Sequence, residues 1–227
     1  MGRLLVAGAR AHPALTLASA MGRGAPREAV AACRVIIDFS LPDGTAQLLE
    51  LLDDQALVVG TTGLSDATLA ALDRHAERAP VLRASNYSTG VTLLMELVGR
   101  AARALPDYDL EIIEMHHRHK RDAPSGTARS LAEAAAEARS VSLTERAVYG
   151  REGDVGPRPG GEIGLHAVRG GDVAGEHTVY LAGPGERITL GHLATSREAF
   201  AQGALRAAAW IAPQPPGIYT MRDVLDL

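Results

Sequence analysis

The first third of the chain alternates short apolar segments with longer segments of helical spacing. Asp43–Asp53 and Ser65–Arg78 have helical spacing with polar faces. The runs expected to form strands are Leu15–Ala20, Val35–Phe39, Ala56–Val59 and Val81–Ala84. This alternation predicts βαβ units and a parallel sheet, in which any nucleotide would bind beyond the carboxyl ends of the strands.

The pattern changes after Asn86, where strands follow one another more closely. The predicted helices are Gly90–Leu105, Thr127–Arg139 and Arg197–Ile211, and the predicted strands are Tyr108–His116, Glu162–Arg169, Glu176–Ala182 and Arg187–Ala194. Arg151–Gly161 is rich in Gly and Pro and predicts a loop. The last three strands are separated by Gly-Gly-Asp and Gly-Pro-Gly, which favour antiparallel hairpins. These elements predict a second domain of the α+β class.

Composition limits the kinds of function to consider. A chain of 227 residues, 46% hydrophobic and 22% charged, can build one large or two small domains. A net charge of −4, a pI near 6.1 and the lack of 18 consecutive apolar residues argue against nucleic-acid and membrane binding. The first residues do not resemble a signal peptide, and a cytoplasmic location is expected. The single cysteine, Cys33, adjoins Val35–Phe39 and is interpreted as a small buried hydrophobe.

The basic residues single out one position. Of 23 basic residues 22 are Arg, and the one Lys is Lys120. A guanidinium is permanently charged, whereas an ammonium can also donate a proton, so a site that needs proton donation does not accept Arg. His116 stands four positions earlier, on the same face whether the backbone is strand or helix. These two residues are therefore candidate acids facing a small anion.

Asp122-Ala-Pro-Ser-Gly-Thr leads into the helix predicted from Thr127. Ser125, Gly126 and Thr127 therefore lie where backbone amides and the positive helix end gather. Such a terminus is a ready anion site, and a carboxylate bound there would also reach Lys120. The competing interpretation is an ordinary Ser N-cap beside a solvated basic strand.

The run from Glu114 to Ala128 resembles the signature of the dihydrodipicolinate reductase family, also called 4-hydroxy-tetrahydrodipicolinate reductase. Other segments resemble this family in the same order: Asp38-Phe-Ser, Gly60-Thr-Thr-Gly, Ala84-Ser-Asn-Tyr-Ser-Thr-Gly, Arg169-Gly-Gly-Asp-Val-Ala-Gly-Glu-His and Gly217-Ile-Tyr-Thr-Met-Arg-Asp-Val-Leu. The resemblance thus covers most of the chain.

The resemblance implies an α/β fold of two domains. Residues 1–87 and 197–227 would form a Rossmann-like nucleotide domain lacking its first strand. Residues 88–196 would form an α+β domain with a mixed sheet for substrate binding and oligomerisation. The implied activity is reduction of 4-hydroxy-tetrahydrodipicolinate to tetrahydrodipicolinate with NADPH or NADH, in the diaminopimelate route to lysine. The implied assembly is a homotetramer.

The resemblance also assigns roles to residues. His116 would donate or accept the proton, and Lys120 would donate a proton and anchor a carboxylate of the dicarboxylate substrate. His117, Ser125, Gly126 and Thr127 would bind this substrate. The implied cofactor-binding residues are Arg23, Gly60, Thr61, Thr62, Ala84, Ser85, Asn86 and Tyr87.

The beginning of the chain departs from the family. Relatives open with a strand and a glycine-rich loop ending in Gly-Arg-Met-Gly-Arg, and Met1-Gly2-Arg3 matches the end of that loop. Arg3–Ala7 is therefore expected to be the following helix rather than a strand, ending before His12. The chain would start at an internal Met of a longer product or be a shortened natural protein. Gly22 stands where an acidic residue reads the ribose, and Arg23 would accept a 2′-phosphate, which favours NADPH.

Two other functions stay open. The first is a dicarboxylate-binding or regulatory homologue with impaired nucleotide binding. The second is a metal-dependent hydrolase using His116, His117 and His119, although adjacent strand residues point to opposite faces and no metal is expected. Arg169-Gly-Gly-Asp172 is interpreted as a tight hairpin rather than an anion loop, and Glu176 and His177 are assigned to sheet pairing or subunit contact. His75, His166 and His192 are expected to be structural.

Overall fold

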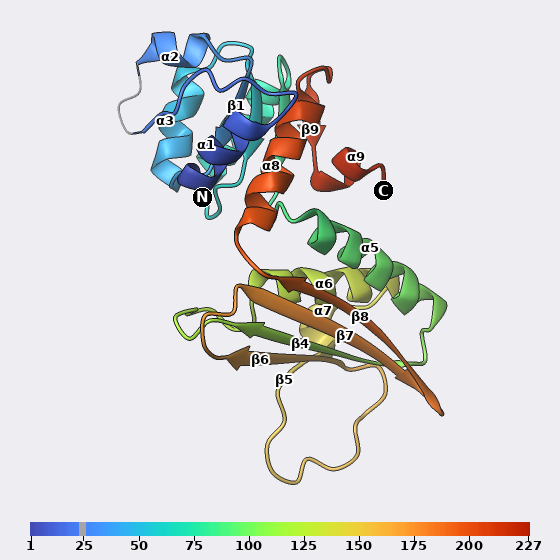
Figure 1. Cartoon of the computed structure of the whole chain (residues 1–227). Coiled ribbons are helices and arrows are strands. Elements are labelled where there is room, and N and C mark those ends of the chain that lie inside the picture. Colours follow the sequence, from blue (N-terminus) through green and yellow to red (C-terminus); the bar gives the residue numbers. More distant parts are fainter. Residues whose placement is uncertain (23–25) are drawn as a thin grey trace. The chain divides into compact units, whose positions relative to one another are not determined.

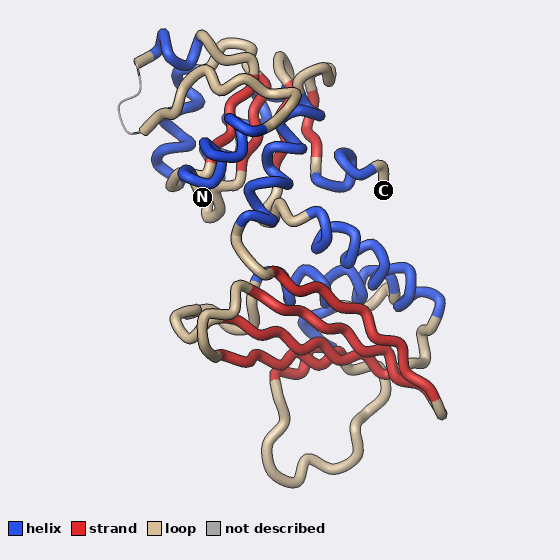
Figure 2. Tube along the Cα trace, viewed as in Figure 1, coloured by secondary structure: helices blue, strands red, loops and turns tan. Residues whose placement is uncertain are grey.

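The computed structural model describes residues 1–22 and 26–227. The chain divides into two compact units, which Figures 1 and 2 show as ribbon and tube. Unit 1 contains Met1–Thr89 and Glu198–Leu227, and unit 2 contains Gly90–Arg197. The helix predicted at the end of the chain therefore returns to the first unit.

Unit 1 is built on a four-stranded parallel sheet of order β1-β2-β3-β9. Its strands are β1 (Val35–Asp38), β2 (Ala56–Val59), β3 (Pro80–Arg83) and β9 (Gly217–Tyr219), and its helices are α1 (Gly2–Ala11), α2 (Arg27–Ala31), α3 (Pro42–Leu51), α4 (Asp66–Ala76), α8 (Glu198–Ile211) and α9 (Met221–Leu225). The parallel sheet expected from the alternation is confirmed, and so is the Rossmann-like fold that the resemblance implies.

Both faces of this sheet are buried. Ala56 and Val58 of β2 belong to a core with α1 and α8, while Leu57 and Val59 belong to a second core with α4. Alternate residues of a strand point to opposite faces, so the uninterrupted apolar run of β2 is what a central strand between two helical layers requires.

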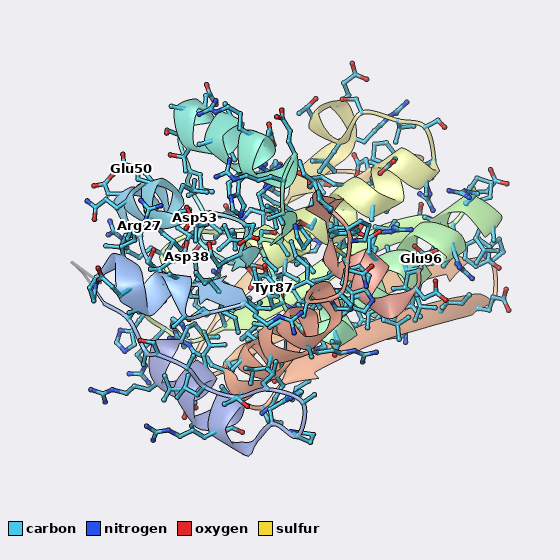
Figure 3. The ribbon with its side chains drawn as sticks, turned by 90° about the horizontal axis from the view of Figure 1, so that it is seen from above. Arg27, Asp38, Glu50, Asp53, Tyr87 and Glu96 are labelled. Atoms are coloured by element: carbon cyan, nitrogen blue, oxygen red, sulfur yellow. The ribbon has the colours of Figure 1, made fainter. Side chains whose placement is uncertain are left out.

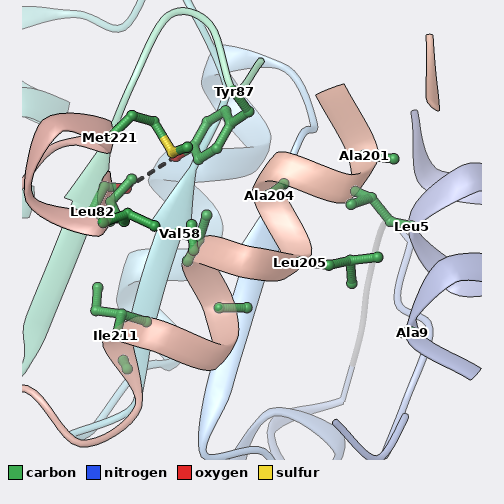
Figure 4. Packing of buried hydrophobic residues seen from close by; sticks show 14 residues of the cluster. Leu5, Ala9, Val58, Leu82, Tyr87, Ala201, Ala204, Leu205, Ile211 and Met221 are labelled. Carbon is green, nitrogen blue, oxygen red and sulfur yellow. Dashed lines mark hydrogen bonds between the residues drawn. The ribbon is translucent and has the colours of Figure 1, made fainter. Parts of the chain in front are cut away.

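Helix α8 approaches the sheet closely (Figure 4). Ala201, Ala204, Leu205 and Ile211 pack with Tyr87 in the first core. A Cβ added at Gly203 would lie 1.6 Å from the carbonyl oxygen of Tyr87. The absence of a side chain at Gly203 therefore sets the distance between α8 and the segment after β3.

The beginning of the chain confirms one expectation and corrects another. Residues Gly2–Ala11 form helix α1, whose buried face includes Leu5 and Ala9, so the helical interpretation of this segment is right. The strand expected at Leu15–Ala20 is wrong, because this segment joins neither sheet. Leu15 and Leu17 pack against the first core without pairing, and an apolar run becomes a strand only where a neighbouring strand supplies hydrogen bonds.

Unit 2 contains a five-stranded mixed sheet of order β5-β6-β4-β7-β8. Its strands are β4 (Asp109–His116), β5 (Ala147–Tyr149), β6 (Ile163–Arg169), β7 (Gly175–Gly183) and β8 (Glu186–Ala194), and its helices are α5 (Thr89–Ala104), α6 (Gly126–Ala138) and α7 (Leu143–Arg146). Helices α5 and α6 cover one face of this sheet (Figure 1). The loop between β5 and β6 extends away from the sheet, as Figure 2 shows.

The hairpin expected at Arg169-Gly-Gly-Asp172 is wrong. Strand β4 lies between β6 and β7, pairing in parallel with the former and antiparallel with the latter. The connection therefore passes over the end of β4, where the Gly170 amide donates to the His116 carbonyl (3.0 Å) and the His117 amide to the Val173 carbonyl (2.8 Å). The other expected hairpin, joining β7 and β8, is confirmed.

Candidate active site

The site of unit 2 begins at the carboxyl end of β4. The side chains of Glu114 and His116 share the helix-covered face of the sheet with Leu110 and Ile112, because strand residues two apart point to the same side. Glu114 is 1% exposed and His116 is 8% exposed. The apolar face of the strand thus ends in two buried polar groups.

Glu114 is bonded on both of its carboxylate oxygens. Oε2 lies 2.6 Å from Nδ1 of His116 and accepts from Nη1 of Arg169 (2.8 Å). Oε1 accepts from Nη2 of Arg169 (2.8 Å) and from the Ser125 amide (3.0 Å). One carboxylate therefore connects the ends of β4 and β6 with the start of α6.

These bonds keep Glu114 ionised. Burial alone would raise the pKa of Glu114, but hydrogen bonds from Arg169, His116 and the Ser125 amide outweigh burial and lower this pKa below its ordinary value. The same pairing raises the pKa of Arg169, which also donates to the Asp122 carbonyl (2.6 Å). The bidentate ion pair of Arg169 and Glu114 therefore holds a carboxylate in a fixed position against the His116 ring.

His177 belongs to the same cluster, although the sequence assigned it to sheet pairing or subunit contact. Its ring packs edge-on against that of His116 with centroids 5.2 Å apart, and its Nε2 lies 3.1 Å from the Ser125 hydroxyl. Burial, followed by the nearby charge of His116, lowers the pKa of His177 to about 4. The His177 ring is therefore neutral near pH 7.

The helix predicted at this point starts where the sequence indicated. Ser125 is the N-cap of α6, and its hydroxyl accepts from the Ala128 amide (3.2 Å). Gly126, which is exposed, and Thr127, which is partly buried, form the first turn. The positive end of a 13-residue helix thus lies beside Glu114 and His177.

Lys120 is neither in a strand nor in a helix, so the expected alignment with His116 by strand or helix periodicity is wrong. Strand β4 ends at His116, and Lys120 follows a turn in which its amide donates to the His117 carbonyl (3.1 Å). Its ammonium donates to Asp122 (2.9 Å), which lowers the pKa of that carboxyl. The charges of His116 and Lys120 both lower the pKa of His177.

His117, which follows the strand, is partly buried. Its Nδ1 is buried without a hydrogen-bond partner in the described ranges, 1–22 and 26–227. Its ring is 6.2 Å from that of His119.

Two of the segments assigned to the cofactor, Gly60–Thr62 and Ala84–Tyr87, follow β2 and β3 in unit 1. Asp38, labelled in Figure 3, ends the neighbouring β1 and accepts from the hydroxyls of Thr45 (2.5 Å) and Thr61 (3.0 Å). The Gly60 amide donates to the Asp38 carbonyl (2.8 Å), and a Cβ at Gly60 would lie 2.4 Å from the Phe39 ring. Thr61 is buried by this arrangement, whereas Thr62 is exposed.

The second assigned segment, Ala84–Tyr87, follows β3. The Ala84 amide donates to the Val59 carbonyl (3.3 Å), which brings this segment beside the end of β2. Ser85 is exposed and Asn86 is partly buried. Tyr87 is 1% exposed, and its hydroxyl donates to the carbonyls of Val59 (2.7 Å) and Leu82 (3.2 Å). The Tyr87 side chain is thus committed to the core, and only its backbone is left for a ligand.

Three expectations concern Arg23, metal ions and membrane-spanning helices. Arg23, the expected 2′-phosphate contact, lies outside the described residues. Among the residues that are described, no group of three or more His, Cys, Asp or Glu is arranged to hold a metal ion. In the same part of the chain, no helix has the length and apolar character needed to cross a membrane.

Sequence reasoning missed three members of the unit 2 cluster: Glu114, Arg169 and His177. Glu114 stands two positions before His116, and this spacing was the available signal, since both residues face the same side of a strand. Arg169 and His177 lie on other strands. Their place beside His116 depends on the strand order, which periodicity does not reveal.

Comparison with known proteins gives a consistent result for both units. The family models described as dihydrodipicolinate reductase, N-terminus and C-terminus, match residues 1–87 and 90–225. A 4-hydroxy-tetrahydrodipicolinate reductase from Halorhodospira halophila is 53% identical over 202 residues, which are 88% of this chain and 76% of that protein. The enzyme of the same name from Caulobacter vibrioides is 48% identical over 209 residues, 90% of this chain and 81% of the other.

A solved structure supports the same assignment. It is the dipicolinate-bound dihydrodipicolinate reductase from Paenisporosarcina sp. TG-14, which is 27% identical, has a TM-score of 0.62 and covers 82% of this chain and 71% of its own. The chain therefore belongs to the dihydrodipicolinate reductase family.

Proposed function

We propose that this protein reduces 4-hydroxy-tetrahydrodipicolinate to tetrahydrodipicolinate with a nicotinamide nucleotide, in the diaminopimelate route to lysine. Relatives about 50% identical over most of the chain carry the reductase name. The observation that carries the proposal is the gathering of His116, the His177 ring and the start of α6, with Lys120 paired to Asp122 just before that helix. Two cationic or proton-bearing groups beside a helix start suit an acidic ring compound.

The reaction consumes one hydride and one proton. Loss of water from the hydroxylated ring gives a conjugated cyclic imine, and addition of a hydride and a proton to that system gives the product. His116 is the proposed proton donor, because an imidazole changes protonation near neutral pH. Lys120 is the proposed second donor and the anchor of one substrate carboxylate.

The proposed substrate contacts lie at the start of α6. Backbone amides in the first turn of a helix point outward and favour an anion. The amides of Gly126 and Thr127 would therefore hold one carboxylate of the dicarboxylate substrate, together with Lys120. Ser125 would line this site as the N-cap, since its own amide is bonded to Glu114. His117, which follows β4 and is partly buried, is the proposed contact for the second carboxylate.

The loops of unit 1 suit a dinucleotide. Nucleotides bind beyond the carboxyl ends of adjacent parallel strands, and Gly60–Thr62 and Ala84–Tyr87 occupy such ends. The exposed Thr62 and Ser85 hydroxyls would face the bound group, with Tyr87 contributing only backbone atoms. NADPH or NADH would supply the hydride when bound. NADPH is the proposed cofactor if Arg23 contacts a 2′-phosphate.

The open face of the unit 2 sheet supports a homotetramer. Ile113, Val168 and Leu193 are exposed on this face at 39%, 42% and 58%. Exposed apolar side chains on a sheet face left without a helical layer are typical of a surface that pairs with another copy. Light scattering of the purified chain should give four times the monomer mass, and a stable monomer would contradict this assembly.

Lys120→Arg tests the role of the ammonium. This change keeps the charge but removes a group that readily gives up its proton, so turnover should fall at least about 100-fold. Arg121→Lys, at the exposed neighbouring position, is the matched control and should keep its rate. An unchanged rate in Lys120→Arg would remove Lys120 from the chemistry.

Cofactor binding separates the reductase from a dicarboxylate-binding homologue. Titration with NADPH, followed by nicotinamide fluorescence, should saturate below millimolar concentration. Binding of dipicolinate without any response to NADPH or NADH would favour the homologue instead.

A further inference from the structure

Glu114 is a buried carboxylate to which the proposed reaction gives no role. It is 1% exposed, and it is bonded by an imidazole, a guanidinium and a backbone amide. Burying a carboxylate is costly unless all of its oxygens are bonded, and Arg169 supplies the charge that makes burial tolerable. Because the Glu114 carboxylate is bonded directly to His116, its role is to be sought in the function of that histidine.

The contact between Glu114 and His116 selects one form of the ring. An ionised carboxylate has no hydrogen to donate, so Nδ1 of His116 must carry the hydrogen in the bond of 2.6 Å to Oε2. The neutral ring then has its free lone pair on Nε2, on the side away from Glu114. The hydrogen bond made by one ring nitrogen decides which tautomer is present.

The start of β7 lies close to Nε2 of His116 without covering it with a side chain. A Cβ at Gly175 would lie 3.0 Å from Nε2, and the φ of +155° at this position is one that residues with side chains rarely adopt. Within the described part of the chain, Nε2 has no hydrogen-bond partner. This nitrogen is therefore the one available to a ligand.

We propose that Glu114 is a positioning residue that fixes the Nδ1–H tautomer of His116 and presents Nε2 to the substrate. Arg169 keeps Glu114 ionised through its bidentate bonds, so Glu114 orients the ring without taking its proton. The Ser125 amide ties the same carboxylate to the helix start that would hold the substrate carboxylate. The position of His116 relative to that helix start is thereby fixed by a single side chain.

The chain contains an internal control on the opposite face of β4. Glu111 accepts from Nε2 of His166 (2.6 Å) and from Arg151 and Arg158, so it is also a carboxylate bonded by arginine and histidine. There the carboxylate holds Nε2 rather than Nδ1. His166 is therefore expected to be the opposite, Nε2–H tautomer in the same spectrum.

Nitrogen-15 NMR of the imidazole rings tests the tautomer without any assay of turnover. At a pH of about 9, where histidine side chains are neutral, wild-type His116 should show a protonated Nδ1, and His166 a protonated Nε2. In Glu114→Gln, His116 should lose this preference, while in Glu111→Gln it should keep it. A protonated Nε2 in wild-type His116 would overturn the proposal, and this result does not depend on the folding of any variant.

Kinetics then test the consequence, which rests on the proposed reductase function. Glu114→Gln should lower kcat about 10- to 100-fold. The Kd for dipicolinate should change less than about threefold, because the residues proposed to hold the ligand's own carboxylates are unchanged. Glu114→Asp keeps the charge but is shorter by one methylene, and it should recover part of the rate. Equal rates in wild type and Glu114→Gln would refute the positioning role. An inactive wild type would refute the reductase instead, while the tautomer measurement would still decide the role of Glu114.

Discussion

The hydroxyl of Tyr87 offers a direct test of how the two strands of unit 1 are joined. This hydroxyl donates to the carbonyl of Val59, the last residue of β2, and to that of Leu82 in β3, and Tyr87 is 1% exposed. Figure 4 shows the bond to Leu82. Burial raises the pKa of Tyr87 well above its ordinary value, which agrees with a neutral phenol. Tyr87→Phe keeps the ring packed 5.2 Å from that of Phe39 and removes only the hydroxyl.

The expected cost follows from what the carbonyls lose. A buried acceptor left without its donor costs about 1–3 kcal/mol, but Val59 also accepts from the Ala84 amide. We therefore expect Tyr87→Phe to lower the free energy of unfolding by about 1–2 kcal/mol. With a urea m-value of about 2 kcal/mol/M, the midpoint should fall by about 0.5–1 M.

The single tryptophan makes this measurement specific to unit 1. Trp210 lies on α8 and packs edge-on against Tyr219, with ring centroids 5.3 Å apart, so its fluorescence reports on this unit. Tyr219→Phe is the matched control, because the exposed Tyr219 hydroxyl donates to Pro215 (2.9 Å) and its loss should cost less than about 0.5 kcal/mol. If both variants unfold at the same urea concentration, the reasoning about Tyr87 is wrong.

Two further predictions concern packing and pH. Gly203→Ala places a methyl group 1.6 Å from the Tyr87 carbonyl oxygen and should lower the free energy of unfolding by at least about 2 kcal/mol. In Gly99→Ala, in helix α5, the new methyl group would lie 3.7 Å from the Ala134 carbonyl oxygen, and the free energy of unfolding should rise by about 0.5–1 kcal/mol. Thermal unfolding followed by circular dichroism would contradict this if both shifts had the same sign. His177, with a pKa lowered from 6.5 to about 4, binds its proton more weakly in the folded state, so stability should fall by about 3 kcal/mol as pH drops from about 6.5 to 4. His177→Gln should show a shallower loss over this window in urea titrations, and an unchanged slope would show that His177 is not the cause.

The candidate site illustrates how far sequence patterns reach. The lone Lys120, the neighbouring histidines and the N-cap at Ser125 were all visible, because residue type and local spacing lie in the sequence. The positions of the loops that begin at Gly60 and Ala84 could be predicted, because each loop follows a predicted strand. What the spacing did not give was the turn that carries Lys120 out of the strand, since a change of backbone direction leaves no periodic signal.

By itself the sequence determined most of the longer strands and helices, the boundaries of α6 to within one residue, and the family, because apolar runs, caps and motifs are local properties. Short elements such as β5, β9 and α2 were missed, since three to five residues carry too little periodicity to be recognised. Only the tertiary structure decided that β4 lies between β6 and β7. That order brings Arg169 to Glu114 across 55 positions and His177 to Ser125 across 52, because hydrogen bonding between strands depends on which edges meet and in which register.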